Sequence, residues 1–125
     1  MIRGIGMDVV TVSRFERMIA RYGDRLLKRL FSEQERRYCS RYAHPAQHYA
    51  ARFAAKEAML KALGVPLGLS WQELEVVTEE NRQPVVRLRG RAEQAAQERG
   101  IARMFVSLTH ERDMAAAVVV AEGGS

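Results

Sequence analysis

The stretch from Arg52 to Gly64 reads RFAAKEAMLKALG, and it decides how the rest of the chain is interpreted. Ala, Leu, Met, Lys and Glu are strong helix formers. Gly64 suits a left-handed helix end, and Pro66 cannot continue a helix. We therefore expect a long helix that begins at Pro45 and ends at Leu63.

Two opposite charges lie one turn apart on this predicted helix. At about 100° per residue, Glu57 and Lys61 share an arc with small and aromatic residues, namely Ala50, Phe53, Ala54, Ala58 and Ala62. An exposed Glu–Lys pair at this spacing is common and contributes only ~0.3–0.5 kcal/mol. The apolar neighbours favour a second interpretation, in which a carboxylate and an ammonium belong to a site at the edge of a packed surface.

Length and composition fit one domain. The chain has 125 residues, 47% of them hydrophobic, so it can bury a core. A chain of this size does not easily enclose a deep cleft, and a substrate site between subunits is expected. The single cysteine, Cys39, excludes an internal disulfide and fits a reducing compartment. Neither a signal core nor a membrane-length apolar run is found, so we expect a soluble, cytoplasmic protein.

Positive charge is concentrated in the first half of the chain. Residues 1–61 hold 13 Lys and Arg against 6 Asp and Glu, whereas residues 62–125 hold 7 against 9, which gives the net charge of +5. A negatively charged partner is implied. The candidates are nucleic acid, a phosphate-rich small molecule and an acidic protein.

The first residues, 1–12, alternate loosely between apolar residues and glycine and predict a buried strand. Asp8 lies inside this strand, between Met7 and Val9. A carboxylate in such a place needs a partner or a metal, unless it lies at the strand end and pairs with a backbone N–H.

A helix is expected to begin at Ser13, because Ser13 and Glu16 have the spacing of a capping box. One side of this helix is apolar, and the other carries a basic stripe of Arg14, Arg17, Arg21 and Arg25. Solvated charge is the ordinary interpretation of such a stripe. The alternative is a docking surface for an acidic helix.

The remaining patterns predict shorter elements. Ser32 and Glu35 form a second capping box, for a helix through about Tyr42, after an apolar patch at 26–31. Strands at 74–79 and 85–89 join through a turn around Asn81 and Pro84, a helix covers 91–99, and a hairpin of 103–110 and 114–122 follows, with its second strand central. The order strand, three helices, hairpin, helix, hairpin predicts an α+β fold with a mainly antiparallel sheet packed against a long central helix.

The sequence lacks the motifs of several common kinds of functional site. The sequence has no GxxxxGK or GxGxxG phosphate loop and no zinc-spaced Cys and His set, and Cys39 has no obvious base beside it. The remaining candidates for a functional site are Asp8, Glu57, Lys61 and, in the last part of the sequence, His110. The two carboxylates are hard oxygen ligands of the kind that Mg²⁺ prefers.

Three motifs resemble the 4'-phosphopantetheinyl transferases: GIGMDVV at 4–10, RFAAKEAMLKALG at 52–64 and SLTH at 107–110. They occur in the family's order and spacing, span almost the whole chain, and are most similar to the short bacterial holo-[acyl-carrier-protein] synthases. The resemblance implies one phosphopantetheinyl transferase domain over residues 1–125. Its reaction would transfer 4'-phosphopantetheine from coenzyme A to a serine of apo acyl carrier protein and release adenosine 3',5'-bisphosphate. A fatty-acid carrier is the default, and a polyketide or other carrier stays open.

The resemblance also implies the catalytic residues. Asp8 and Glu57 match the family's Mg²⁺ ligands, and Lys61 matches its lysine beside the coenzyme A pyrophosphate, where it would neutralise the leaving phosphate. His110 completes the implied catalytic set. The serine proton would pass to Glu57 or to a metal-bound water, and the sequence leaves both open.

Binding residues follow from the same comparison. Ser107 and His110 match a strand motif that contacts coenzyme A phosphates, with Lys61 at the pyrophosphate and Arg52 and Lys56 as further candidates by position. The residues that align with the family's docking helix for the acidic carrier protein are Arg14, Met18 and Arg21.

Subunit organisation is implied as well. Val10 stands where longer, two-copy members of the family carry a second acid, so the chain resembles the short subgroup, which is typically trimeric with sites between subunits. Asp8 and His110 are then expected from one subunit, and Glu57 and Lys61 from the next. No membrane or nucleic-acid partner is implied.

Two other functions are compatible with part of the sequence. A small basic nucleic-acid-binding module would use the arginines. It leaves Asp8 and Glu57 unexplained, and the aromatic residues, 7% of the chain, are not interleaved with the basic stripe. The other rival is an inactive scaffold that binds carrier protein without catalysis. The presence of every motif residue argues against it.

Overall fold

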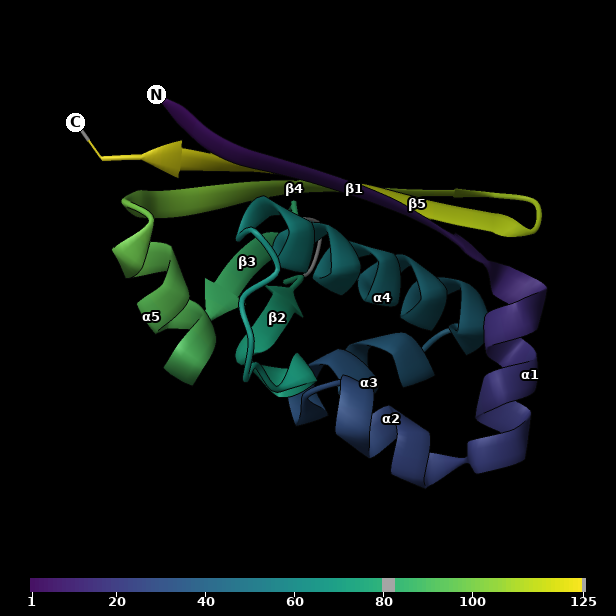
Figure 1. Ribbon diagram of the computed structural model, residues 1–125. Helices are drawn as coiled ribbons and strands as arrows, with labels where there is room; N and C mark the ends of the chain where they lie inside the picture. The colour runs from purple at the N-terminus through teal and green to yellow at the C-terminus, as the bar shows by residue number, and fades with distance from the viewer. Residues whose placement is uncertain (80–82, 125) are drawn as a thin grey trace.

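Helix α4 (Pro45–Ala62) runs through the middle of the molecule, and the other elements pack around it (Figure 1). The computed structural model describes residues 1–79 and 83–124. Leu63 caps α4 and Gly64 follows with a positive φ of 79°, so the predicted long helix and its glycine end are confirmed. Most of the alanines of α4 are buried, which lets neighbouring backbones approach the helix closely.

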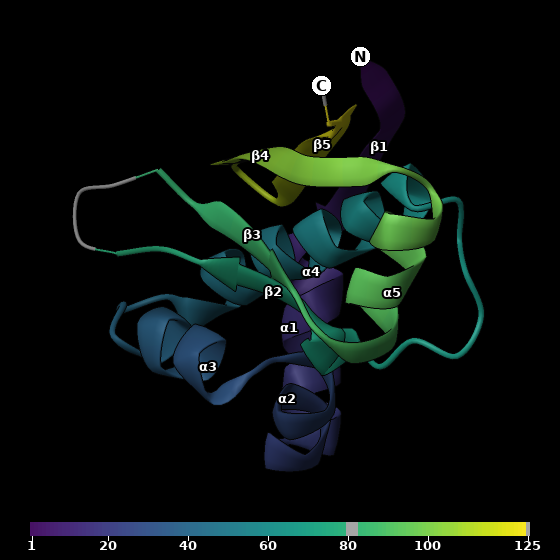
Figure 2. The ribbon, with the colours of Figure 1, turned by 90° about the vertical axis from the view of Figure 1, so that its left-hand side faces the viewer.

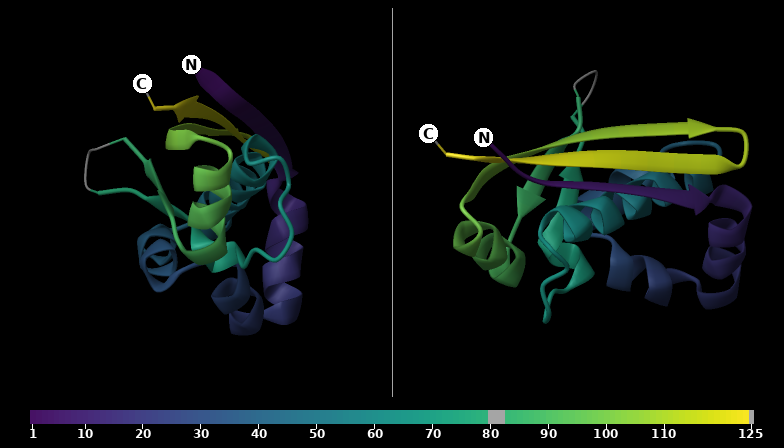
Figure 3. Two further views of the ribbon diagram at one scale, coloured as in Figure 1. Left: turned by 60° about the vertical axis from the view of Figure 1, so that its left-hand side comes forward. Right: turned by 45° about the horizontal axis from the view of Figure 1, so that its top comes forward.

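A sheet of long antiparallel strands covers one side of α4. It consists of β1 (Ile2–Thr11), β5 (Met114–Gly123) and β4 (Ile101–Glu111) in the order β1-β5-β4 (Figure 3). The last strand of the chain is therefore central, as its apolar sequence predicts. Alternate residues of β5, from Ala115 to Ala121, are buried toward α4.

Glycines bring β1 against the helix backbone. A Cβ atom at Gly6 would lie 1.9 Å from the carbonyl oxygen of Ala58, and one at Gly4 would lie 2.2 Å from that of Ala62. No side chain larger than hydrogen fits there. This close approach fixes which residues of β1 face α4.

A second, smaller antiparallel sheet pairs β2 (Leu74–Val77) with β3 (Val85–Leu88), after a short 3₁₀ helix η1 (Trp71–Glu73). Helix α5 (Gly90–Glu98) then leads into β4, as Figure 2 shows from the side. The predicted hairpin is confirmed in its strands. Asn81, placed at its turn, lies outside the described residues, and η1 was not predicted.

Three helices lie on the side of α4 away from the large sheet (Figure 1). They are α1 (Val12–Tyr22), α2 (Asp24–Leu30) and α3 (Glu33–Ser40). The capping box of Ser32 and Glu35 is confirmed. Helix α2 is an addition, because the sequence predicted only an apolar patch there. It is short, and Gly23, with a φ of 63°, separates it from α1.

The start of α1 differs from the prediction. Its N-cap is Thr11, without a side-chain cap, so the predicted box of Ser13 and Glu16 is wrong. Instead, Asp113 from the β4–β5 turn accepts hydrogen bonds from Ser13 N at 2.8 Å and Ser13 Oγ at 2.6 Å. A residue 100 positions away in sequence therefore satisfies the first turn of α1.

The hydrophobic core has two clusters that meet along α4. One lies between α4, the large sheet and α5 and centres on Met59 and Val119, and the other lies between α4 and α1–α3 and centres on Phe15 and Phe31. Among the described residues, no helix is both long and apolar enough to cross a bilayer.

Candidate active site

Asp8, Glu57 and Lys61 come together on the β1 side of α4. Asp8 follows Gly6 by two residues, so both face the helix. Lys61 Nζ lies 3.3 Å from Asp8 Oδ1 and donates a hydrogen bond to Met7 O at 2.9 Å. The expected division, with Asp8 in one subunit and Glu57 and Lys61 in the next, is wrong, because β1 lies directly against the last turns of its own α4.

Glu57 is half-buried in this group. Burial, and then the neighbouring charge of Asp8, raise the pKa of its carboxyl above the usual value, while Lys61 acts in the opposite direction. Two carboxylates this close repel one another, and a cation between or beside them would relieve that repulsion. The electrostatics therefore fit a cation-binding pair of acids.

Asp8 and Glu57 can hold a divalent metal only with outside help. Within residues 1–79 and 83–124, no group of at least three His, Cys, Asp or Glu side chains is positioned around one point. Mg²⁺ commonly takes one or two carboxylates and fills its other positions with water and substrate phosphates. Two adjacent carboxylates with an ammonium beside them suit a Mg²⁺ that arrives with a phosphate ligand.

A polar pocket of about 510 Å³ lies toward the opposite edge of the sheet, near β4. Its polar lining comes from α3, α4, β4 and the ends of the small hairpin, and includes Tyr38, His48, Arg52, Thr78, Gln83, Ser107 and His110. Of the described residues that line it, none carries a carboxylate. The pocket is therefore suited to an anion.

Arg52 is the fixed positive charge of this anion pocket. Its side chain is buried, its guanidinium lies 4.0 Å over the ring of Tyr38, and its Nη2 donates to Thr78 Oγ1 at 2.7 Å. Its Nε is buried and has no hydrogen-bond partner among the described residues. A buried guanidinium with an unused donor calls for a ligand that accepts hydrogen bonds.

The structure adds His48 to the predicted residues of the pocket. Its ring stacks on Tyr42 with centroids 3.8 Å apart and meets the ring of His110 edge-on at 5.8 Å. Burial, then Arg52, then His110 lower the pKa of His48. The sequence held one usable signal, since His48 precedes Arg52 by four residues and must share its face of α4.

His110 and Ser107 both line this pocket, but they do not lie beside Asp8. Asp8 is on β1 and His110 on β4, and β5 separates these edge strands. One chain thus carries two groups of candidate residues at opposite edges of its sheet.

Lys56 has a different environment from the one predicted for a phosphate ligand. It is fully buried, and its Nζ lies 2.7 Å from Glu35 Oε1 and donates to the carbonyl oxygens of Trp71 and Leu74 at 2.9 and 2.6 Å. Its donors are used inside the protein, so a direct contact with an incoming phosphate is not available. Lys56 instead joins α4 to α3 and β2.

Cys39 is likewise an interior residue. It is fully buried, and burial raises the pKa of its thiol to about 12. A thiol in this state does not act as a nucleophile, in agreement with the sequence interpretation.

The basic stripe of α1 is exposed. Arg14, Met18 and Arg21 are exposed. Arg21 also borders a hollow of about 420 Å³, together with Arg25 and Arg29 of α2. The stripe therefore continues onto a helix that the sequence did not predict.

The face of the large sheet away from α4 is apolar and exposed. Ile5, Met7 and Val9 of β1 lie on it, and Phe105 of β4 lies across β5 from Ile5 because both pair with Val120. No described element of this chain covers these side chains. An apolar surface of this kind is typical of a subunit interface.

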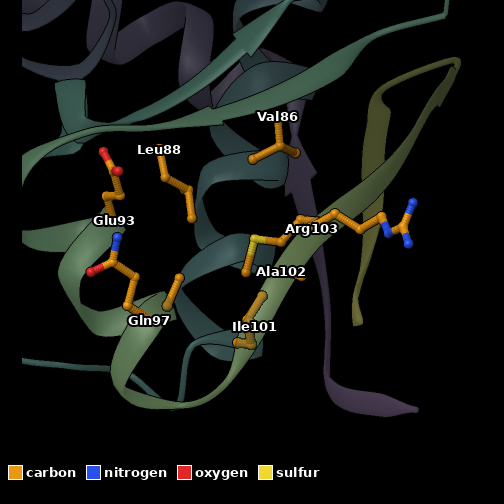
Figure 4. A pocket seen from close by; sticks show the side chains of 9 residues that line it. Val86, Leu88, Glu93, Gln97, Ile101, Ala102 and Arg103 are labelled. Carbon is orange, nitrogen blue, oxygen red and sulfur yellow. The ribbon is translucent and has the colours of Figure 1, made fainter. Parts of the chain in front are cut away.

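A further pocket, of about 250 Å³, lies between β3, α5 and the start of β4 (Figure 4). Apolar side chains, among them Val86, Leu88 and Ile101, line it, with Glu93 and Gln97 of α5 at its edge. Arg103 points away from the other labelled side chains, and its Nε lies 2.8 Å from a carboxylate oxygen of Glu122. None of the described residues that line this pocket is a candidate site residue.

Comparisons with known proteins agree with this arrangement. Residues 4–119 match the 4'-phosphopantetheinyl transferase superfamily. Holo-[acyl-carrier-protein] synthases of Geobacter metallireducens and Clavibacter michiganensis are 48% and 49% identical to the chain, each over 98% of this chain and 98% of the relative.

Solved structures give the same result. The holo-[acyl-carrier-protein] synthase of Neisseria meningitidis superposes with a TM-score of 0.87 at 31% identity, covering 98% of this chain and 99% of that one. The Helicobacter pylori holo-[acyl-carrier-protein] synthase in complex with coenzyme A superposes with a TM-score of 0.81 at 29% identity, covering 94% and 99%. The α+β fold expected from the sequence is therefore confirmed, and the chain belongs to the 4'-phosphopantetheinyl transferase superfamily, a family of transferase enzymes.

Proposed function

We propose that this protein is a Mg²⁺-dependent holo-[acyl-carrier-protein] synthase. It transfers 4'-phosphopantetheine from coenzyme A to a serine of apo acyl carrier protein and releases adenosine 3',5'-bisphosphate. The observation that carries the proposal is the group of Asp8, Glu57 and Lys61, in which Lys61 Nζ lies 3.3 Å from Asp8 Oδ1. Full-length similarity to holo-[acyl-carrier-protein] synthases supports the choice of substrates.

The reaction exchanges the phosphoanhydride bond of the coenzyme A pyrophosphate for a phosphoester bond to serine. The serine Oγ attacks the phosphorus that carries pantetheine, a new P–O bond forms, and the bond to the bridging oxygen of the pyrophosphate breaks. In this proposal Lys61 neutralises the oxygen that leaves with adenosine 3',5'-bisphosphate and returns a proton to it. The serine proton passes to Glu57 or to a water molecule.

Asp8 and Glu57 would hold the Mg²⁺ ion. When bound, Mg²⁺ supplies positive charge to the pyrophosphate oxygens and so stabilises the charge of the transition state. The two protein ligands leave room for phosphate oxygens and water. Lys61 then serves both to bind the pyrophosphate and to assist departure of the leaving group.

Arg52, Ser107 and His110 are proposed to bind further phosphate of coenzyme A. They line the anion pocket, in which the described residues supply no carboxylate. Lys56 is removed from this set because its ammonium is enclosed by Glu35 and two backbone carbonyls.

We propose a homotrimer with active sites between subunits. The apolar outer face of the sheet supplies an interface, and the two groups of candidate residues lie at opposite edge strands, β1 and β4. Joining the β1 edge of one subunit to the β4 edge of the next would bring Asp8, Glu57 and Lys61 of one chain to Arg52, Ser107 and His110 of another.

The acidic carrier protein is proposed to dock on α1 through Arg14, Met18 and Arg21. These residues are exposed, and arginines attract and orient an acidic helix. A role in fatty acid biosynthesis and a cytoplasmic location follow from the proposed partner. The residues 1–125 are proposed to act as one domain, since both core clusters include residues of α4.

Intact-mass spectrometry tests the function. Apo acyl carrier protein is incubated with this protein, coenzyme A and Mg²⁺, with and without EDTA. A gain of one phosphopantetheine mass that EDTA prevents is the expected result. No gain with several carrier proteins, while coenzyme A still binds, would point to a scaffold that binds without catalysis.

A further inference from the structure

The anion pocket contains an imidazole, that of His48, which the predicted phosphate contacts do not include. Arg52 supplies a permanent charge, and the imidazoles of His48 and His110 come from α4 and β4, with ring centroids 5.8 Å apart. A positive charge on His48 is costly in the absence of a ligand, because burial, Arg52 and His110 all disfavour it. A ligand with concentrated negative charge would reverse that cost.

Ring stacking holds His48 in place, and among the described residues no hydrogen bond involves its ring nitrogens. The face of the imidazole stacks on Tyr42 at 3.8 Å with an interplanar angle of 20°, and Tyr38 meets the ring edge-on at 6.2 Å. Stacking engages the ring face, whereas the nitrogen lone pair and N–H lie in the ring plane. The position of the ring is thus fixed while its hydrogen-bonding groups stay available to a ligand in the pocket.

Two tyrosines, a guanidinium and a second imidazole surround His48. Tyr38 and Tyr42 face it from α3 and the segment that follows, Arg52 from its own helix, and His110 from β4. Arg52 and His110 both lower the pKa of His48, after burial, which has the largest effect. A bound anion offsets these repulsions, so binding and proton uptake by His48 are coupled.

Of the phosphates of coenzyme A, the monoester is the one that suits this pocket. Under the proposed function the pyrophosphate lies beside Asp8, Glu57 and Lys61, at the β1 edge. The remaining phosphate is the 3'-monoester, which carries a charge of about −1.5 to −2 near neutral pH because its second pKa is about 6. It can accept hydrogen bonds from several donors at once.

We propose that His48 is a direct ligand of the 3'-phosphate, together with Arg52 and His110, and that it increases the preference of this enzyme for coenzyme A over 3'-dephospho-coenzyme A. This inference rests on the proposed function. It assigns a specificity-determining role to a residue that lies outside the three sequence motifs of the family.

The test compares His48→Phe with wild type by calorimetric titration of coenzyme A and of 3'-dephospho-coenzyme A. Phenylalanine keeps the stack on Tyr42 and removes both ring nitrogens. Loss of one charge-assisted hydrogen bond predicts about tenfold weaker binding of coenzyme A. Binding of the dephospho form should change less than about twofold, because the lost partner is absent from that ligand.

Two controls sharpen the test. His44→Phe changes an exposed histidine just before α4 that does not line the pocket, and it should bind both ligands like wild type. His48→Gln guards against a folding defect, since it keeps a hydrogen-bond donor but cannot be charged. It should retain part of the affinity for coenzyme A and lose the proton uptake, measured by titration in buffers of different ionisation enthalpy.

Turnover separates this inference from the proposed function. For His48→Phe, the KM for coenzyme A should rise by about the same tenfold factor, with kcat little changed. Equal weakening of both ligands, or no weakening of either, in an enzyme that still modifies carrier protein would overturn the role of His48 and leave the function standing. Failure of wild type to bind coenzyme A or to modify any carrier protein would overturn both.

Discussion

Lys56 Nζ and Glu35 Oε1 lie 2.7 Å apart, and both side chains are completely buried. Glu35 also accepts hydrogen bonds from Ser32 N and Val76 N at 2.8 and 2.9 Å, so the pair fastens α3 and β2 to α4. Burial lowers the pKa of Lys56 despite the opposing charge of Glu35. The two charges therefore compensate one another only in part. Removing one of them would leave the other buried without a counter-charge, which is energetically costly.

Glu35→Gln should reduce the free energy of unfolding by about 3–5 kcal/mol, because it leaves an ammonium buried without its counter-charge. Chemical denaturation measures the loss. Adding Lys56→Met to Glu35→Gln should restore part of the stability. A double variant that is less stable than Glu35→Gln by the full effect of Lys56→Met would contradict coupling between the two residues.

The control is an exposed ion pair within α3, the helix that carries Glu35. Arg37 and Glu33 form an ion pair at 2.8 Å in α3, but both side chains are largely exposed. Glu33→Gln should therefore change stability by less than about 0.5 kcal/mol.

Gly6→Ala should loosen the active site as well as the fold. Its Cβ would lie 1.9 Å from the backbone oxygen of Ala58, so β1 must move away from α4. We expect a loss of at least about 1–3 kcal/mol in stability and a loss of Mg²⁺-dependent turnover, since Asp8 moves with the strand. Denaturation and holo-protein formation measure the two effects.

Gly124→Ala is the matched control for that change, because a Cβ there would meet only the side chain of Ala102, at 3.8 Å. Stability within about 0.5 kcal/mol of wild type is expected. If Gly6→Ala behaved in the same way, the close approach of β1 to α4 would not be needed.

The hydrogen bonds from Ser13 of α1 to Asp113 should make the stability of the protein depend on pH. Its hydrogen bonds with Ser13 lower the pKa of its carboxyl in the folded protein. A lowered folded-state pKa stabilises the protein above the ordinary Asp pKa of about 3.9, and this contribution is lost as the pH falls through the folded-state value. Asp113→Asn should therefore have a lower melting temperature than wild type near neutral pH, with the difference shrinking in acid.

Glu111→Gln provides the comparison, as it removes another exposed carboxylate from the same hairpin end. Its melting temperature should follow that of wild type across the pH range. A gap between Asp113→Asn and wild type that stays constant down to low pH would argue against a cap that depends on ionised Asp113.

Glu57→Gln should lower Mg²⁺-dependent turnover by about 10²-fold or more, because it removes a proposed metal ligand and a candidate base together. The fold should be retained, since Glu57 is only half-buried and at the edge of the core. Initial rates of holo-protein formation across a range of Mg²⁺ concentrations measure the effect. Near-normal rates would remove Glu57 from the proposed site.

Arg14→Glu should weaken binding of the acidic carrier protein by about tenfold or more, chiefly at low salt, and leave the affinity for coenzyme A unchanged. Arg37→Glu, on α3 and outside the stripe, controls for the change in net charge. Surface plasmon resonance with immobilised apo carrier protein, and calorimetry with coenzyme A, give the two affinities. Equal losses for both ligands would contradict a docking role for α1.

The sequence by itself determined the elements that depend on local physics. The composition of residues 52–64 predicted α4 and its glycine end, the Ser32–Glu35 box predicted α3, and the apolar run of 114–121 predicted a central strand. Helix α2 and η1 escaped prediction because elements of this length have weak periodicity. Motif spacing also selected Asp8, Glu57 and Lys61, and residues 4–119 match the family to which those motifs pointed.

Only the tertiary structure decided which partner each charge has. Asp113, and not Glu16, accepts the hydrogen bonds at the start of α1. Lys56 forms a buried ion pair with Glu35, and Lys61 forms an ion pair with Asp8 of the same chain. The spacing of His48 from Arg52 places both on one face of α4, but its contact with His110 of β4 follows only from the tertiary fold. Helical and strand periodicities fix the face on which a side chain lies, whereas its partner depends on contacts between segments far apart in sequence, which local propensities do not encode.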